Sequence, residues 1–378
     1  MMPLADIHLM LVSEQAAPNV LPALDAALKP VEAVLCTTAK MAERAADLEP
    51  VLRESGVKVS RLSLSNEHDF AKMQDELLSF AAQRDGELIA VNLTGGTKLM
   101  ALAAQSVAKI AGWRVFYVDV DTDEVSWLDE QVARHALAHQ ARLRHYLRAY
   151  GFQIDGGIER PQPLQRQSDL LRTLIVQVGS LESPLSQLNW LAQQAEDARR
   201  LHVDLTPALS DSRSLDTLLR QFAEAGVLQL SGNRISFASE AERTFAKGGW
   251  LEEHVFRVIT QVTGELGLRD KAAGLQVIDR SGAKNELDVS FLARNRLHVI
   301  ECKTARMDRP EAPKANDALF KLAEISRRVG GLGTRAMLAS YRAVGESERR
   351  LAKALRVELV CGPELARLPE RIHTWVKR

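Results

Sequence analysis

The chain has 378 residues, of which 46% are hydrophobic and 26% charged, and its net charge is zero. This length exceeds one ordinary hydrophobic core and predicts two or three globular domains. No apolar run approaches the roughly 20 residues of a transmembrane helix, no basic leader precedes the first apolar segment, and three scattered cysteines form no disulfide framework. These features exclude a membrane protein and a disulfide-stabilised secreted protein, so we expect a cytoplasmic protein without membrane contact.

The first 125 residues alternate short apolar segments with amphipathic ones. The apolar segments, rich in β-branched residues, are 7–12, 33–37, 57–64, 87–93 and 113–120, and the amphipathic segments between them are 18–29, 39–55, 67–84 and 97–111. Strands separated by helices of this length predict a doubly wound parallel sheet. Residues 124–127 are expected to add a hairpin edge strand, and 131–150 to form a helix that leaves this domain.

A glycine-containing loop, Asn92-Leu93-Thr94-Gly95-Gly96-Thr97-Lys98, connects the fourth strand to the following helix. Two glycines allow a sharp turn and close approach to a ligand, and Thr97 is well placed as the helix N-cap. Free amides at a helix N-terminus, next to Lys98, favour an anion. The spacing matches neither the dinucleotide motif nor the Walker A motif. The sequence therefore predicts an anion site, with a plain glycine-rich turn as the alternative.

The middle of the chain reads as a linker followed by a mainly helical segment. Residues 151–163 hold three glycines and two prolines, and 168–245 are mainly helical. A helix at 214–224 precedes a hairpin at 227–230 and 234–237, which is how a winged helix-turn-helix ends. Because Arg213 and Arg220 are balanced by Asp216 and Glu224, we favour a structural spacer over a DNA reader.

Two neighbouring predicted strands near the C-terminus carry the strongest chemical signal. Asp288 lies on the first strand, and Glu301 and Lys303 lie on the second, where residues i and i+2 point to one face. The helix before them carries Glu252. Two carboxylates and a lysine on one surface can hold a divalent metal and stabilise a phosphodiester transition state, which favours a nuclease. The alternative is a solvated sheet face with cross-strand ion pairs.

The charge distribution suits a polyanionic substrate. Residues 269–378 contain 23 Lys and Arg against 14 Asp and Glu, whereas residues 1–146 carry 14 against 20. A basic C-terminal third favours contact with nucleic acid, although ordinary solvated surface charge would give a similar count. Further elements are predicted there: a helix at 315–329, a strand at 335–339, a helix at 346–355 and a strand at 357–360.

The order of helix acid, Asp288 and Glu301-Cys302-Lys303 resembles the PD-(D/E)xK restriction-endonuclease-like superfamily, whose core is helix, three antiparallel strands, helix and strand. The resemblance implies that Asp288 and Glu301 bind Mg²⁺ or Mn²⁺, together with the main-chain carbonyl of Cys302. It implies that Lys303 orients or deprotonates the attacking water and stabilises the phosphate. Leu287 stands where the superfamily has proline. Glu252 matches the helix acid, and Glu253 is the competing choice.

The string Asn-x-Thr-Gly-Gly-Thr-Lys-x-Met resembles the CRISPR-associated Rossmann fold (CARF) family, which senses cyclic oligoadenylate. With Gly248-Gly249-Trp250-Leu251-Glu252-Glu253 and the acidic core, it resembles the CARF-fused ancillary nucleases of type III CRISPR defence. The resemblance implies a homodimer that binds one cyclic tetra-adenylate across its two-fold axis. The residues it assigns to ligand contact are Ser13, Gln15, Thr37, Thr38, Asn92, Thr94, Gly95, Gly96, Thr97 and Lys98.

The resulting expectation is an α/β protein with three parts: a Rossmann-like CARF sensor at 1–145, a linker and winged-helix-like segment at 146–246, and a restriction-endonuclease-like domain at 247–378. It would cleave single-stranded DNA or RNA, or nick duplex DNA, when cyclic tetra-adenylate binds. The main rival is a ligand-gated winged-helix transcription regulator with an inactive nuclease-like domain. A binding-only adaptor and a sensor that slowly cleaves its own activator are further alternatives, and the sequence leaves open the nucleic acid, the ring size and the metal.

Overall fold

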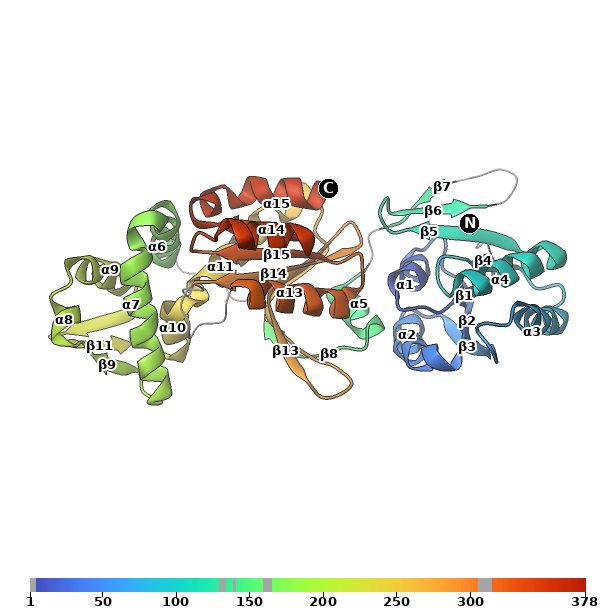
Figure 1. Ribbon diagram of the computed structural model, residues 1–378, viewed down its shortest axis with the longest axis horizontal. Helices are drawn as coiled ribbons and strands as arrows, with labels where there is room; N and C mark the ends of the chain where they lie inside the picture. The colour runs from blue at the N-terminus through green and yellow to red at the C-terminus, as the bar shows by residue number, and fades with distance from the viewer. Residues whose placement is uncertain (1–4, 129–133, 139–140, 159–164, 305–314) are drawn as a thin grey trace.

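The computed structural model describes residues 5–128, 134–138, 141–158, 165–304 and 315–378. Figure 1 shows three lobes in a row, with the C-terminal domain between the N-terminal domain and the middle segment. The chain therefore passes the central lobe on its way to the middle segment and then returns to it, so the last domain in sequence contacts both of the others.

The N-terminal domain is a seven-stranded sheet in the order β3-β2-β1-β4-β5-β6-β7. Its strands are β1 (Ile7–Leu11), β2 (Glu32–Thr37), β3 (Lys58–Ser63), β4 (Ile89–Asn92), β5 (Arg114–Asp119), β6 (Glu124–Trp127) and β7 (Arg134–Ala136). Its helices are α1 (Ala17–Leu24), the 3₁₀ turn η1 (Ala39–Met41), α2 (Ala42–Glu54), α3 (Phe70–Gln83) and α4 (Lys98–Ala111). The first five strands of this order are parallel, which confirms the predicted doubly wound sheet.

Alternation along β1 explains the two layers of helices. Leu9 and Leu11 face a core shared with α3 and α4, whereas Met10 and Val12 face the core of α1 and α2. Successive side chains of a strand point to opposite faces, so an all-apolar strand is buried on both sides. Because β1, β2 and β4 are parallel, their carboxyl ends meet at one edge of the sheet, where the glycine loop lies.

The C-terminal domain is a six-stranded sheet in the order β16-β15-β14-β13-β12-β8. Its strands are β8 (Gln153–Ile158), β12 (Asp270–Ile278), β13 (Lys284–Ala293), β14 (Arg296–Lys303), β15 (Arg335–Ser340) and β16 (Val357–Cys361). Its helices are α11 (Trp250–Gln261), α12 (Thr263–Leu266), α13 (Ala315–Gly330), α14 (Glu346–Ala354), the 3₁₀ turn η3 (Gly362–Arg367) and α15 (Leu368–Lys377). The predicted core of helix, three antiparallel strands, helix and parallel strand is confirmed, and α15 is an addition.

The interpretation of residues 151–163 as a linker is wrong for the part of it that the structure describes. Strand β8 pairs antiparallel with β12 and forms the edge of the C-terminal sheet. Gly157 has a φ of 136°, and a methyl group there would collide with Leu275. The glycines therefore serve a tight, irregular strand pairing rather than a flexible connection.

The helix predicted at 131–150 is also wrong in its first half. Residues 134–136 form β7, which pairs with β6, and of the residues described in this range those of α5 (Leu143–Ala149) are helical. The His135 ring lies 3.1 Å from the Asp25 carboxylate, which also accepts a hydrogen bond from the Ala138 amide at 2.8 Å. These tertiary contacts stabilise an extended conformation over the local helical preference.

The middle segment runs from α6 to η2. Its elements are α6 (Gln165–Val176), α7 (Val178–Asp197), β9 (His202–Asp204), α8 (Pro207–Ser210), α9 (Arg213–Glu224), β10 (Leu228–Ser231), β11 (Arg234–Phe237), α10 (Glu240–Thr244) and the π-helical turn η2 (Phe245–Gly249). Helix α9 and the β10–β11 hairpin confirm the predicted winged-helix pattern. Arg220 pairs with Asp216 at 2.9 Å and Arg234 with Asp204 at 2.7 Å, so these two arginines are bound within the segment.

The middle segment and the C-terminal domain share one hydrophobic core. A single cluster of buried residues includes Leu188 and Phe222 of the middle segment, together with Trp250, Phe291 and Ile300. The Tyr341 hydroxyl, at the end of β15, donates a hydrogen bond to the Leu174 carbonyl of α6 at 3.0 Å. The segment is therefore packed against the end of the sheet where β14 and β15 terminate.

A second cluster joins the N-terminal and C-terminal domains, since it runs from Met10 and Leu35 through Tyr150 to Leu297 and Leu338.

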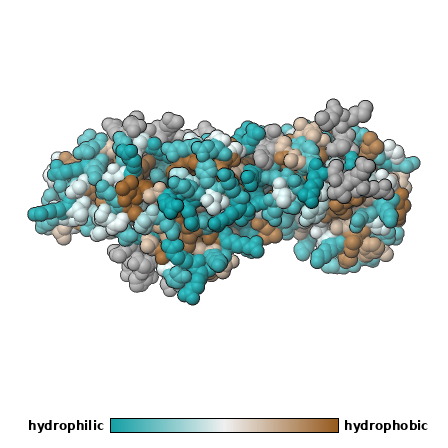
Figure 2. Space-filling model, turned by 90° about the horizontal axis from the view of Figure 1, so that it is seen from above, coloured by the Kyte–Doolittle hydropathy of each residue, from teal (hydrophilic) through white to brown (hydrophobic). Residues whose placement is uncertain are grey.

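Figure 2 shows a largely hydrophilic surface over the central lobe on the face viewed. No helix in the described ranges combines the length and the apolar character needed to cross a bilayer.

Candidate functional site

The structure brings together the acids predicted on β13, β14 and α11. The Asp288 carboxylate accepts a hydrogen bond from the Cys302 amide at 2.7 Å, and the Lys303 ammonium lies 2.6 Å from the Glu301 carboxylate. The charges of Glu301 and Glu252 both act on Asp288. Glu252, Asp288 and Glu301 therefore form one carboxylate cluster with Lys303 beside it.

The local sequence explains this convergence. Strands β13 and β14 are antiparallel with Val289 opposite Ile300, which places Asp288 and Glu301 side by side just beyond that pair. The alternate residues Val289 and Ile300 point into the core. Because side chains alternate along a strand, the acids project to the opposite face from this apolar anchor.

Burial and repulsion perturb the protonation of the cluster. Burial, followed by the charges of Glu301 and Glu252, raises the pKa of the Asp288 carboxyl well above its usual value. Burial acts to lower the pKa of the Lys303 ammonium, but Glu301 and Asp288 outweigh it and the pKa is raised. The lysine is therefore charged at neutral pH, whereas Asp288 is a carboxyl group whose ionisation is costly without a cation. A fully solvated sheet face would not perturb Asp288 in this way.

The donor set fits a hard divalent cation. Two carboxylates, from Asp288 and Glu301, and the main-chain carbonyl of Cys302 are oxygen ligands of the kind that Mg²⁺ and Mn²⁺ bind. The Cys302 side chain itself is buried in the core, as expected, and burial raises the pKa of its thiol well above its usual value. Within the described residues, no three His, Cys, Asp or Glu side chains are placed so that they could hold a metal together.

The glycine loop (residues 94–98) lies against the end of β1. A methyl group at Gly95 would collide with the Leu11 carbonyl, and Gly96 has a φ of 71°. Thr97 is the N-cap of α4, since its hydroxyl accepts a hydrogen bond from the Met100 amide at 3.2 Å. Thr97 and Lys98 are exposed. The predicted N-cap is thus confirmed, and the anion site at the α4 N-terminus stays a prediction.

Other predicted ligand residues hold the loops in place. Asn92 is fully buried and donates hydrogen bonds to the Pro18 carbonyl at 2.9 Å and to Asn19 at 3.0 Å. Its oxygen accepts from the Thr94 hydroxyl at 2.7 Å, and that hydroxyl accepts from the Val118 amide. In this structure Asn92 and Thr94 bind protein groups that fix the start of the glycine loop.

The predicted contacts after β2 are also buried. Thr37 and Thr38 are 3% and 5% exposed, and the Thr38 hydroxyl donates to the Glu67 carboxylate at 3.1 Å. A ligand could reach these two hydroxyls only if neighbouring groups moved. Their contact with ligand stays a prediction.

The loop after β1 connects the glycine loop to the C-terminal domain. A methyl group at Gly95 would come within 3.4 Å of the Ser13 hydroxyl. Two residues further on, the Gln15 side chain accepts a hydrogen bond from the Leu332 amide, between α13 and β15, at 2.9 Å. The structure thus places Gln15 at a domain contact, which sequence reasoning missed because nothing near Leu332 marks a partner.

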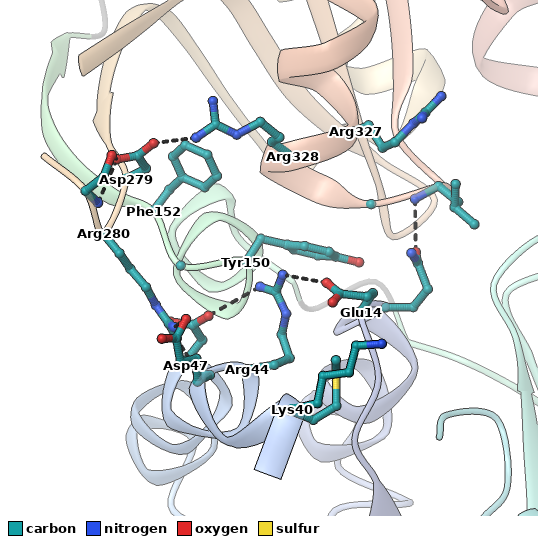
Figure 3. A pocket seen from close by; sticks show the side chains of 17 residues that line it. Glu14, Lys40, Arg44, Asp47, Tyr150, Phe152, Asp279, Arg280, Arg327 and Arg328 are labelled. Atoms are coloured by element: carbon teal, nitrogen blue, oxygen red, sulfur yellow. Dashed lines mark hydrogen bonds and ion pairs between the residues drawn. The ribbon is translucent and has the colours of Figure 1, made fainter. Parts of the chain in front are cut away.

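An interdomain cleft of about 700 Å³ opens beside this contact. Figure 3 shows Arg44 below Tyr150, between the Glu14 and Asp47 carboxylates, which lie 3.2 and 3.3 Å from its guanidinium. Arg280 of the C-terminal domain also binds Asp47. The Arg280–Asp47 pair therefore bridges the two domains at the cleft, whereas both Arg44 pairs lie within the N-terminal domain.

Two family models match the chain in separate ranges. Residues 7–146 match the Card1 CARF domain, and residues 239–378 match the Card1-like endonuclease domain. These ranges cover the two domains that hold the glycine loop and the carboxylate cluster. No curated protein matches the chain significantly.

Solved structures match along nearly the whole length. Protein VC1899 from Vibrio cholerae has 26% identity and a TM-score of 0.90, with 98% of each chain covered. Can2 from Sulfobacillus thermosulfidooxidans, solved with cyclic tetra-adenylate, has 23% identity and a TM-score of 0.83, with 98% of this chain and 99% of that chain covered. A type III CRISPR defence DNA nuclease activated by cyclic oligoadenylate has 24% identity and a TM-score of 0.55, covering 90% of this chain and 46% of that one.

The perturbed carboxyl predicts an unusual stability effect. Folding raises the pKa of the Asp288 carboxyl. As the pH rises above the ordinary carboxyl range, the unfolded chain therefore loses a proton that the folded chain still holds. The ionised group therefore destabilises the metal-free fold at neutral pH. We expect Asp288→Asn to raise the thermal unfolding midpoint by a few degrees at pH 7.5 in EDTA, with a smaller gain near pH 4.

Mn²⁺ should stabilise the wild type at pH 7.5 and leave Asp288→Asn unchanged, as followed by differential scanning fluorimetry. Glu286→Gln, an exposed acid on the same strand, is the matched control and should behave as the wild type. An Asp288→Asn variant no more stable than the wild type at either pH would contradict the buried-charge account.

Proposed function

We propose that this chain, a CARF-domain ancillary nuclease of type III CRISPR systems, is activated by cyclic tetra-adenylate. The ligand binds at the N-terminal domain, which is the sensor. Binding starts metal-dependent cleavage of single-stranded DNA or RNA by the C-terminal domain, which is the effector. The observation that carries this proposal is the carboxylate cluster, in which Asp288 is buried against Glu301 and Glu252 with Lys303 alongside. Such a cluster is costly to fold and is suited to a cation and a phosphate.

Each residue of the cluster has a distinct role in this proposal. Asp288 and Glu301 hold Mg²⁺ or Mn²⁺, and the bound cation supplies charge to stabilise the phosphorane and to lower the pKa of water. Lys303 is protonated at neutral pH, so it stabilises negative charge on the phosphate rather than accepting a proton. The Lys303 ammonium, held beside Glu301, would lie next to a phosphate bound at this site.

The substrate proposal rests on charge. The C-terminal 110 residues carry a surplus of nine positive charges, which attracts a polyanion. The solved DNA nuclease that shares this fold makes DNA the first substrate to test, with RNA beside it. We place the protein in the cytoplasm, where defence against foreign nucleic acid takes place.

The sensor proposal rests on the exposed polar groups around the glycine loop. The main chain of residues 94–98, the Thr97 cap and Lys98 offer amides and a positive charge to the phosphates of a cyclic oligoadenylate. Can2, which shares the fold, was solved with cyclic tetra-adenylate, which supports that ring as the activator. Ser13 is the next contact we propose because it lies beside the glycine loop.

We propose further that two copies pair through α3 and α4. Phe70, Leu99 and Leu102 lie on these helices and are 38%, 37% and 55% exposed. In a parallel doubly wound sheet both helices begin at the carboxyl edge of the strands, next to the glycine loop. A two-fold pairing there would bury the apolar side chains and place two glycine loops around one ring-shaped ligand.

Gating follows from the loop after β1, which reaches from Ser13 beside the glycine loop to the Gln15–Leu332 hydrogen bond. Ligand that shifts this loop also shifts the connection between α13 and β15, and β15 pairs with the catalytic strand β14. The activator must favour the active arrangement by several kcal/mol for such a switch to be effective.

The direct test is cleavage of labelled single-stranded DNA, single-stranded RNA and supercoiled plasmid by the purified chain. We expect cleavage with Mn²⁺ or Mg²⁺ and cyclic tetra-adenylate, little with cyclic tri- or hexa-adenylate, and none in EDTA. Asp288→Ala should lower the rate by roughly 10²- to 10³-fold or more, because it removes the main charge that organises the transition state. Equal rates with and without activator would remove the gating, and an active Asp288→Ala variant would remove the assigned site.

Gln15 separates coupling from binding. One neutral hydrogen bond contributes about 0.5–1.5 kcal/mol, so Gln15→Ala should change activated cleavage by about two- to tenfold while the Kd for cyclic tetra-adenylate stays within about twofold. Isothermal titration calorimetry and cleavage kinetics on one preparation measure both quantities. Gln229→Ala, at an exposed glutamine of β10 in the middle segment, is the matched control. Lost affinity with normal maximal cleavage would instead make Gln15 a ligand contact, as the sequence predicts.

The pairing surface is tested with Leu102→Glu. A charge in an apolar interface is costly to bury, so we expect a monomer by light scattering and little activation by cyclic tetra-adenylate. Leu88→Glu is the control, because Leu88 is 63% exposed but precedes β4 at the opposite edge of the sheet. A Leu102→Glu variant that stays dimeric and activatable would contradict pairing through α4.

A further inference from the structure

A polar face of α7 lies along the C-terminal domain. Glu182, Ser186, Asn189 and Glu196 recur at helical spacing and so share one side of the helix. Glu182 binds Arg342 at 3.2 Å, Asn189 donates a hydrogen bond to the Thr304 hydroxyl at 3.2 Å, and Glu196 binds Lys247 at 2.5 Å. Helix α7 therefore contacts two segments of the C-terminal domain and the turn η2 that leads into it, all three through side chains.

Each of those three segments adjoins the proposed catalytic centre. Lys247 lies in the π-helical turn that leads into α11 and Glu252. Thr304 directly follows Lys303. Arg342 follows β15, whose last residue, Ser340, pairs with Lys303 in the sheet. Contacts along one face of α7 thus surround the ends of the elements that carry the carboxylate cluster.

The tightest of these contacts joins Gly248, Thr304 and Asn189. Gly248 has a φ of 143°, which L side chains rarely adopt, and a methyl group there would collide with the Thr304 hydroxyl. The same hydroxyl accepts the hydrogen bond from Asn189. The Asn189 side-chain oxygen is buried and has no hydrogen-bond partner among the described residues, so the bond to Thr304 is made by the amide nitrogen. π-Helical turns such as η2 are frequent at functional sites.

We propose that Asn189 of the middle segment is a positioning residue for the nuclease, which acts through Thr304 on the placement of Lys303 and of the α11 turn. The inference rests on the proposed function, because it takes Lys303 as the group that stabilises the phosphate. Asn189 holds the hydroxyl next to the lysine, and the unusual backbone of Gly248 leaves room for it. The middle segment is therefore part of the catalytic apparatus rather than a spacer between sensor and effector.

The experiment uses the full chain with Mn²⁺ and cyclic tetra-adenylate and measures kcat and KM on single-stranded DNA and RNA. Asn189→Ala and Thr304→Val should each lower kcat by about two- to tenfold, the effect of one lost hydrogen bond, with KM within about twofold. The double variant should be no slower than the slower single variant, because both changes remove the same contact. Thr304→Ser, which keeps the hydroxyl, should retain wild-type kcat.

Gln194→Ala is the matched control, since Gln194 is exposed on α7 and should leave kcat and the unfolding midpoint unchanged. If Asn189→Ala lowers the unfolding midpoint, the comparison of Thr304→Val with Thr304→Ser tests the same contact without altering α7. Three results would each overturn the positioning role. The first is a wild-type kcat in both Asn189→Ala and Thr304→Val, the second is additive losses in the double variant, and the third is a raised KM with normal kcat. An inactive wild type would instead overturn the proposed function itself.

Discussion

The Asp288 carboxyl lies at the end of the C-terminal sheet, where the charges of Glu301 and Glu252 act on it, and the proposed site depends on this costly placement. Asp288 cannot ionise there cheaply, because burial and the charges of Glu301 and Glu252 oppose it. The hydrogen bond from the Cys302 amide and the ammonium of Lys303 offset only part of this cost. A site that is unfavourable when empty and that fits a divalent cation points to function rather than to stability.

The three parts of the chain meet at or near the strands that carry this cluster. The middle segment packs against the ends of β14 and β15 through α6 and α7, and the N-terminal domain reaches the loop between α13 and β15 through Gln15. These polar contacts lie within extensive apolar packing. Such an arrangement allows small shifts in the sensor to alter catalytic geometry without separating the domains, since packed interfaces favour discrete alternative arrangements.

Much of this could be predicted from the sequence where local pattern and tertiary structure agree. The apolar strand patterns of the N-terminal domain and the Thr97 cap predicted the Rossmann-like sheet, and the alternation around Asp288 and Glu301 predicted the nuclease core. The structure confirms both folds. The sequence failed where pairing with distant residues decides the conformation. Gly156 and Gly157 belong to a stretch predicted as a linker but lie in strand β8, which pairs with β12. Residues 134–136 form a strand because β6 and Asp25 hold them extended. The contacts of Gln15 and Asn189 lie 317 and 115 residues away in the chain and leave no local signal.

The most direct test of the account is a crystal structure of the chain grown with Mn²⁺, with data collected at the manganese absorption edge. The account predicts one strong anomalous peak between Asp288 and Glu301, within bonding distance of the Cys302 carbonyl. A map without a peak at that position at saturating Mn²⁺ would contradict it.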